Sequence, residues 1–173
     1  MRILKIFALI LFTMNTTAQS IHDISYTSID GDLVSMSSYK DSYVLIVNVA
    51  SRCGYTSQYN ELQELHETHE NLQVLGFPCN QFGAQEPGSE SEIKAFCSSR
   101  FSVDFPMSSK IDVKGRDISP IYQWLCNKKY NQLNDHEVSW NFNKFLIGPN
   151  GNLIAYFPSS VNPLSEEIKK HIK

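Results

Sequence analysis

The sequence predicts an α/β protein in which a central sheet is flanked by helices, and two observations support this fold class. Two short apolar runs, Tyr43–Val49 and Leu72–Phe77, lack polar alternation, as is typical of strands that are buried on both faces. Each run is followed along the chain by a polar stretch whose apolar residues recur at helical spacing. Alternating strands and helices, followed by a hairpin and a last helix, indicate a central mixed sheet covered by helices.

Two elements surround the first buried strand. Residues 23–34 are expected to form a β-hairpin at an edge of the sheet, because the turn signal Asp30-Gly31-Asp32 separates two short strand-like segments. After the strand, a helix is expected over residues 57–70, with Thr56 or Ser57 available as its N-cap.

The second half of the chain supplies further helices and the strands that complete the sheet. In order, we expect a helix starting at Ser89 or Ser91, a strand at 111–113, a helix over 118–129, strands at 140–147 and 153–157 joined by a turn at 148–151, and a closing helix over 164–172. Together these elements predict a thioredoxin-like sandwich with an N-terminal β-hairpin.

Residues 1–20 have the layout of a secretory signal peptide. A basic start is followed by the apolar run Ile6–Met14 and by small residues, with cleavage expected after Ala18 or Ser20. The run is too short for a comfortable membrane span, although an uncleaved anchor is the alternative. We therefore expect one domain over residues 21–173 without stable membrane insertion, exported to the periplasm in a bacterium and secreted otherwise.

Composition and charge exclude several classes of function. The formal net charge of -3 offers no basic surface for nucleic acid. The five histidines are scattered; His66 and His69 can share a helix face, but no third ligand completes a metal site. The chain has no phosphate-binding glycine loop. We expect neither a metal nor another cofactor.

Among the four cysteines, Cys53 has the clearest chemical context. It lies between a buried strand and a helix, at the carboxyl edge of the sheet, where open α/β sheets place their chemistry. A helix N-terminus stabilises the thiolate, which is the nucleophilic form of cysteine. Thr56 stands where a C-x-x-C motif would have its second cysteine, which disfavours a dithiol exchanger. The alternative interpretation of Cys53 is an inert buried thiol.

A thiolate that attacks a peroxide O–O bond needs hydrogen-bond donors around it. Gln81 and Asn141 offer amide N–H groups, and Trp140 offers an indole N–H. Each residue also has a purely structural alternative, because Trp140 could pack in the core and the two amides could satisfy loop backbone groups.

Three segments resemble the signature blocks of the glutathione peroxidase family: NVASRCGYT (48–56), GFPCNQFGAQEPG (76–88) and WNFNKFLI (140–147). The resemblance implies a thioredoxin-like fold and a catalytic tetrad of Cys53, Gln81, Trp140 and Asn141. It also implies reduction of hydrogen peroxide and organic hydroperoxides in response to oxidative stress, with glutathione or a thioredoxin-like protein as reductant.

The resemblance further implies an internal resolving cysteine on the helix that carries Cys97. This thiol would capture a sulfenic acid at Cys53 as a disulfide before over-oxidation. The common family pattern has that cysteine at the position of Ser98, about 100° away around a helix. Bridging requires Cα atoms within about 7 Å, so the helix would have to unwind locally. Cys79 is the second candidate for the resolving cysteine. The alternative for Cys97 is a structural thiol on the apolar face of its helix, and Cys126 is expected in the core.

Two further expectations concern assembly and the competing function. The chain resembles compact family members that lack an intersubunit loop, which implies a monomer able to accept bulky hydroperoxides. The alternative function is a thioredoxin-like disulfide-handling or binding module without peroxidase turnover. The absence of a second thiol at Thr56 argues against disulfide exchange.

Overall fold

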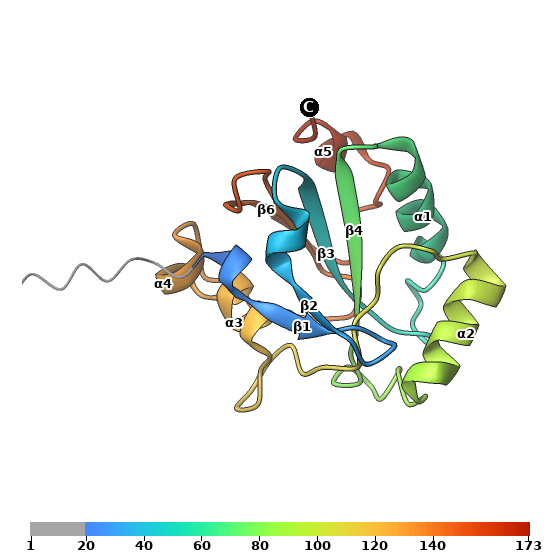
Figure 1. Cartoon of the computed structure of the whole chain (residues 1–173). Helices are drawn as coiled ribbons and strands as arrows, with labels where there is room; N and C mark the ends of the chain where they lie inside the picture. The colour runs from blue at the N-terminus through green and yellow to red at the C-terminus, as the bar shows by residue number, and fades with distance from the viewer. Residues whose placement is uncertain (1–19) are drawn as a thin grey trace, which may run out of the picture.

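The computed structural model describes residues 20–173, so the predicted signal peptide, except for Ser20, lies outside the described residues. In chain order the elements are η1 (Ile21–Asp23), β1 (Ser25–Thr27), β2 (Leu33–Ser35), η2 (Met36–Tyr39), β3 (Tyr43–Val49), α1 (Gln58–Thr68), β4 (Leu72–Pro78), α2 (Glu90–Phe101), α3 (Pro120–Cys126), α4 (Lys128–Asn131), β5 (Lys144–Ile147), β6 (Leu153–Phe157) and α5 (Glu166–Lys169) (Figure 1).

The central sheet is mixed, as predicted, with the strand order β4-β3-β5-β6. Strands β3 and β4 are parallel, with Tyr43 beside Leu72 and Val49 beside Pro78, whereas β5 is antiparallel to both β3 and β6. One face of the sheet packs against α3, and the opposite face packs against α1, α2 and α5 (Figure 1). Because both faces are covered, β3 is apolar on both sides and its sequence does not alternate.

The N-terminal hairpin forms as predicted, but it does not pair with the central sheet. Strands β1 and β2 make a separate two-stranded sheet in which Tyr26 lies beside Val34. The segment around Met107 connects the hairpin to the edge of β4. On one side Met107 forms a β-bridge with Gly76 of β4, and on the other its carbonyl accepts the N–H of Ile29 at 2.9 Å.

The expected strand at 111–113 is absent, and its place is taken by an irregular segment. The N–H of Val113 donates to the side-chain Oε1 of Gln81 at 2.8 Å, and the N–H of Lys114 donates to the same atom at 3.1 Å. A side chain therefore satisfies backbone groups that a neighbouring strand would otherwise satisfy.

Two expected helices are also shorter than predicted. The helix expected over 118–129 divides at Asn127, which is extended and whose side chain accepts the N–H of Lys129 at 2.9 Å to cap α4. The closing helix is reduced to Glu166–Lys169, and at its start Asn162 Oδ1 accepts the N–H of Leu164 in a turn that precedes the helix.

The strand expected at 140–147 begins only at Lys144, and residues 139–143 form a loop. Phe142 has a left-handed backbone with φ 63°, which no strand residue adopts. Asn48 of β3 holds this loop: its Nδ2 donates to the carbonyl of Trp140, and its Oδ1 accepts the N–H of Asn143, both at 3.0 Å.

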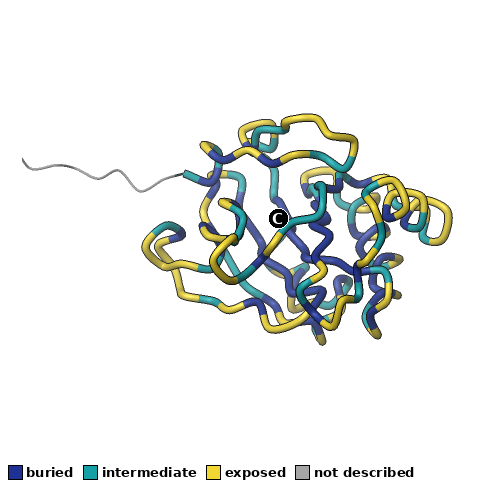
Figure 2. The backbone as a smooth tube through the Cα atoms, turned by 90° about the horizontal axis from the view of Figure 1, so that it is seen from below, coloured by how far each residue is buried: buried dark blue, intermediate teal, exposed yellow. Residues whose placement is uncertain are grey.

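Buried residues gather in the middle of the molecule, while exposed residues follow its outer loops and helix turns (Figure 2). Within residues 20–173, no helix has the length and apolar character needed to cross a membrane.

Candidate active site

Three loops meet at one edge of the central sheet. The parallel strands β3 and β4 end side by side at Val49 and Pro78, so the loops that follow them leave the sheet together. Strand β5 runs in the opposite direction and starts at Lys144 beside Val47, which brings the preceding 139–143 loop to the same edge. The prediction that the segment after β4 shares an edge with Cys53 is therefore confirmed.

Direct contacts join these loops to one another. The carbonyl of Gln85 accepts the N–H of Arg52 at 3.0 Å, and its side-chain Oε1 accepts the Nδ2 of Asn141 at 2.9 Å. The rings of Phe82 and Trp140 pack with centroids 5.9 Å apart. The three segments that resemble family signatures thus form one continuous structure, with Gln85 as the link between the Cys53 loop and the 139–143 loop.

Cys53 is buried in a turn that precedes α1, with 9% of the residue exposed. Its N–H donates to Thr56 Oγ1 at 3.0 Å, and the Thr56 hydroxyl donates to the carbonyl of Ala50 at 2.9 Å. These bonds direct the Cys53 Sγ at the backbone N–H of Tyr55, which donates to it at 3.4 Å. Thr56, predicted as a possible N-cap and as the residue that replaces a second cysteine, therefore also closes the turn that holds the thiol.

The side chain of Gln81 is turned towards the segment after residue 112. Its Nε2 donates to the carbonyl of Lys114 at 2.9 Å, in addition to the two bonds that its Oε1 accepts from residues 113 and 114. In the described structure Gln81 therefore holds this segment against the sheet edge at which β3 and β4 end, which we call the active-site edge. Donation from Gln81 to Cys53 stays a prediction.

Trp140 and Asn141 lie in the same loop but differ in burial. Trp140 is 39% exposed, contrary to the alternative that it packs in the core, whereas Asn141 is fully buried. The backbone carbonyl of Asn141 accepts the hydroxyl of Ser159 at 2.6 Å. The side-chain Oδ1 of Asn141 has no hydrogen-bond partner in the part of the chain that the structure describes. Donation from these two side chains to Cys53 likewise stays a prediction.

The four cysteines are free thiols in this structure, and the sheet separates them into two pairs. Cys53 and Cys97 belong to the apolar cluster on the α1 and α2 face, whereas Cys79 and Cys126 pack on the α3 face. Burial raises the pKa of Cys97 to about 11, although the nearby hydroxyl of Tyr59 lowers it in part. Cys97 is therefore a protonated thiol at neutral pH while it remains buried.

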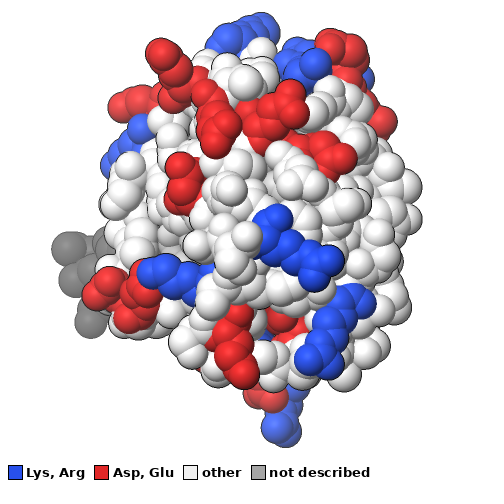
Figure 3. Space-filling model, turned by 90° about the vertical axis from the view of Figure 1, so that its right-hand side faces the viewer, with Lys and Arg blue, Asp and Glu red and all other residues white. Residues whose placement is uncertain are grey.

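A hollow of about 400 Å³ lies next to the Cys53 loop and is lined by Ser51, Arg52, Glu86 and part of α2. Figure 3 shows this side of the molecule, with a hollow whose floor carries acidic atoms. The carboxylate of Glu86 is buried and accepts the hydroxyl of Ser51 at 3.1 Å, and burial raises its pKa. Ser51 and Glu86 were not predicted as site residues, although both lie in the quoted signature segments.

The chain is similar to known proteins over most of its length. Residues 21–126 match the family model for glutathione peroxidase. The chain is 43% identical over 157 residues to a probable phospholipid hydroperoxide glutathione peroxidase of Citrus sinensis, covering 89% of this chain and 92% of the relative. It is 42% identical over 154 residues to glutathione peroxidase-like peroxiredoxin 2 of Saccharomyces cerevisiae, covering 87% and 95% respectively.

Among solved structures, a similar fold occurs in the crystal structure of Trgpx in its apo form. The TM-score is 0.70 and the sequence identity 38%, over 90% of this chain and 94% of that chain. The fold, the order of the three signature segments and the shared length all lead to one conclusion: this chain belongs to the glutathione peroxidase family.

Proposed function

We propose that this protein is a thiol peroxidase that reduces hydrogen peroxide and organic hydroperoxides through Cys53. The observation that carries the proposal is that three loops meet at the sheet edge that holds a buried thiol, whose sulfur accepts a backbone N–H from Tyr55 at 3.4 Å. This N–H is one of the donors that an attack on a peroxide O–O bond needs around the sulfur. Asn141 Oδ1 supports the proposal as well, because it is a buried acceptor without a partner among the described residues and could receive the hydroxyl of a hydroperoxide.

The first chemical step is nucleophilic attack by the Cys53 thiolate on the terminal peroxide oxygen. The S–O bond forms as the O–O bond breaks, and the leaving alkoxide takes up a proton and departs as an alcohol, or as water when the substrate is hydrogen peroxide. Cys53 becomes a sulfenic acid and is thereby oxidised by two electrons. The amides of Gln81 and Asn141 and the indole of Trp140 are the proposed donors to the sulfur and to the departing oxygen.

Cys97 is the proposed resolving thiol. Its sulfur attacks the Cys53 sulfenic acid, a disulfide forms and water leaves. Cys97 is favoured over Cys79 because Cys97 shares the α1 and α2 face with Cys53, whereas Cys79 lies across the sheet. Only Ile93 and Cys97 are buried along α2, but Phe96 and Phe101 also pack against this apolar cluster. Opening of the helix would therefore also separate Phe101 from the ring of Tyr59, 5.3 Å away.

The resulting disulfide favours a thioredoxin-like dithiol protein as the reductant, and the peroxiredoxin name of the yeast relative is consistent with this choice. Glutathione is the alternative reductant if the sulfenic acid persists without a disulfide. We also propose export of the protein, a monomeric state, a role under oxidative stress and activity on bulky lipid hydroperoxides. The name of the Citrus sinensis relative supports the last point.

The test is oxidation of the reduced protein by one equivalent of hydrogen peroxide, followed by stopped-flow thiol measurement and mass spectrometry. We expect rapid loss of the Cys53 thiol and a Cys53–Cys97 disulfide in the wild type. Cys97→Ser should retain the rapid first step but accumulate sulfenic and then sulfinic acid at Cys53. Cys126→Ser is the matched control and should behave as the wild type. Slow, non-stoichiometric thiol loss in the wild type would favour the disulfide-handling module instead.

A further inference from the structure

Lys144 is a fully buried lysine at the first position of β5, directly after the loop that carries Trp140 and Asn141. Its Nζ donates to the carbonyl of Phe142 at 2.8 Å. Burial lowers the pKa of Lys144 to about 7, and the carboxylate of Glu61 on α1 acts in the opposite direction. A buried amine is unfavourable for folding unless its hydrogen bonds compensate, so the bond to the Phe142 carbonyl offsets part of this cost.

The residue that Lys144 contacts has an unfavourable backbone conformation. Phe142 is left-handed with φ 63°, a region that residues other than glycine occupy only when surrounding contacts enforce it. Its N–H donates to the carbonyl of Asn48 at 2.6 Å, and its ring packs edge-to-face on Tyr59 at 5.5 Å. Lys144 supplies the partner for the remaining polar group of Phe142, its carbonyl.

The left-handed residue determines where its neighbours point. Asn141, just before Phe142, directs its Nδ2 to Gln85 at 2.9 Å, on the loop that also binds the N–H of Arg52. Asn143, just after it, directs its Nδ2 to Ser159 at 2.7 Å, inside the protein. A change in the orientation of the Phe142 peptide would therefore move Asn141 relative to the Cys53 loop.

We propose that Lys144 is a positioning residue for the peroxide step: its amine fixes the Phe142 carbonyl and thereby places Trp140 and Asn141 at the active-site edge. The inference rests on the proposed function, since it assigns Lys144 to the reaction of Cys53. The side chain does not touch the reacting atoms and acts through the backbone of the 139–143 loop.

The experiment compares Lys144→Met, which keeps the length of the side chain but has no donor, with Lys144→Arg, which keeps N–H donors and the positive charge. Both are made in the full chain, beside the exposed-lysine control Lys128→Met. The Cys53 thiol is followed by stopped flow with hydrogen peroxide. Reduction of the oxidised protein is followed separately with dithiothreitol, so that the two half-reactions are resolved.

Lys144→Met should slow the peroxide reaction by about 10- to 100-fold, as expected for a small displacement of reacting groups, while the dithiothreitol reaction stays unchanged. Quenching of tryptophan fluorescence by acrylamide should increase if the loop moves. The signal reports on Trp140, which is 39% exposed, rather than on Trp124, which is 4% exposed. Lys144→Arg should restore most of the peroxide rate. A merely structural role would instead slow both half-reactions together.

An unchanged peroxide rate in folded Lys144→Met would overturn the inference, whereas slow thiol loss in the wild type would overturn the proposed function. If Lys144→Met does not fold, Lys144→Gln takes its place. The rates of its peroxide and dithiothreitol reactions then decide whether Lys144 has the positioning role. Equal slowing of both half-reactions in either variant also rejects the positioning role.

Discussion

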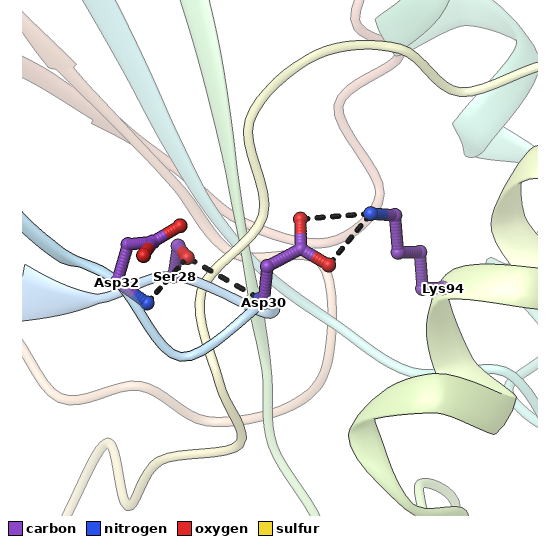
Figure 4. A network of polar contacts seen from close by, with 4 residues as sticks. All are labelled: Ser28, Asp30, Asp32 and Lys94. Carbon is purple, nitrogen blue, oxygen red and sulfur yellow. Dashed lines mark hydrogen bonds and ion pairs between the residues drawn. The ribbon is translucent and has the colours of Figure 1, made fainter.

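The two regions that carry the proposed cysteines differ in how they are held. The edge that contains Cys53 is fixed by buried hydrogen bonds between distant segments, such as those from Asn48 to the 139–143 loop. Helix α2, which carries Cys97, buries only Ile93 and Cys97 among its twelve residues. On its outer side, α2 is tied to the β1–β2 turn by an ion pair in which Lys94 Nζ contacts both oxygens of Asp30 at 2.6 and 2.7 Å (Figure 4).

This difference matches the two steps of the proposed reaction. Attack on a peroxide benefits from donors that are already in place, and buried networks provide such rigidity. The proposed resolution step requires Cys97 to leave its buried position, and opening of α2 would expose Ile93 and separate Phe101 from Tyr59. In the proposed reaction the Cys53 edge would therefore stay fixed, whereas helix α2 would open.

The largest effect should come from Asn48→Leu, which tests the fixed region. The substitution leaves the Trp140 carbonyl and the Asn143 N–H without their buried partner, and each such loss destabilises by about 1–3 kcal/mol. We expect urea unfolding to show a loss of about 2–4 kcal/mol, with a slower peroxide reaction. Asn60→Leu on the exposed side of α1 is the control. A loss below about 0.5 kcal/mol would show that Asn48 does not hold the loop.

A smaller effect is expected from pH, through Lys144. Because its folded-state pKa of about 7 lies below the usual 10.5, the unfolded chain binds more protons than the folded protein above pH 7. The free energy of unfolding should therefore rise between pH 7 and 8, by at most about 1 kcal/mol per pH unit. Urea unfolding at several pH values measures this slope. In Lys144→Met the contribution of Lys144 to the slope should be absent. An identical slope in both proteins would contradict the assignment.

The smallest effect should come from the ion pair on α2. Both side chains are more than half exposed, and such pairs contribute about 0.2–1 kcal/mol. If opening of α2 limits resolution, Asp30→Asn and Lys94→Met should each accelerate Cys53–Cys97 disulfide formation by up to about five-fold at low salt. The exchanged pair Asp30→Lys with Lys94→Asp should restore the wild-type rate. Quenched-flow mass spectrometry measures the disulfide, and equal rates in all four proteins at low salt would exclude this role.

Several features of the site were predictable because they depend on local patterns. The non-alternating run at 43–49 identified the buried strand before Cys53, and the turn signals identified the hairpins. Ser89 was predicted as a possible helix start, and it caps α2 through a reciprocal pair of bonds with Glu92. Such signals act over a few residues, so their physical cause is present in the sequence itself.

Other features depended on contacts between residues far apart in the chain. The partner of Gln81 at Val113, the left-handed backbone of Phe142 and the burial of Lys144 arise where separate loops pack together. By itself, the sequence determined the sheet, the edge at which Cys53 lies and the family resemblance. Only the tertiary structure decided which cysteine shares the Cys53 face and which side chains hold the loops, because burial and hydrogen-bond partners exist only after distant segments have packed.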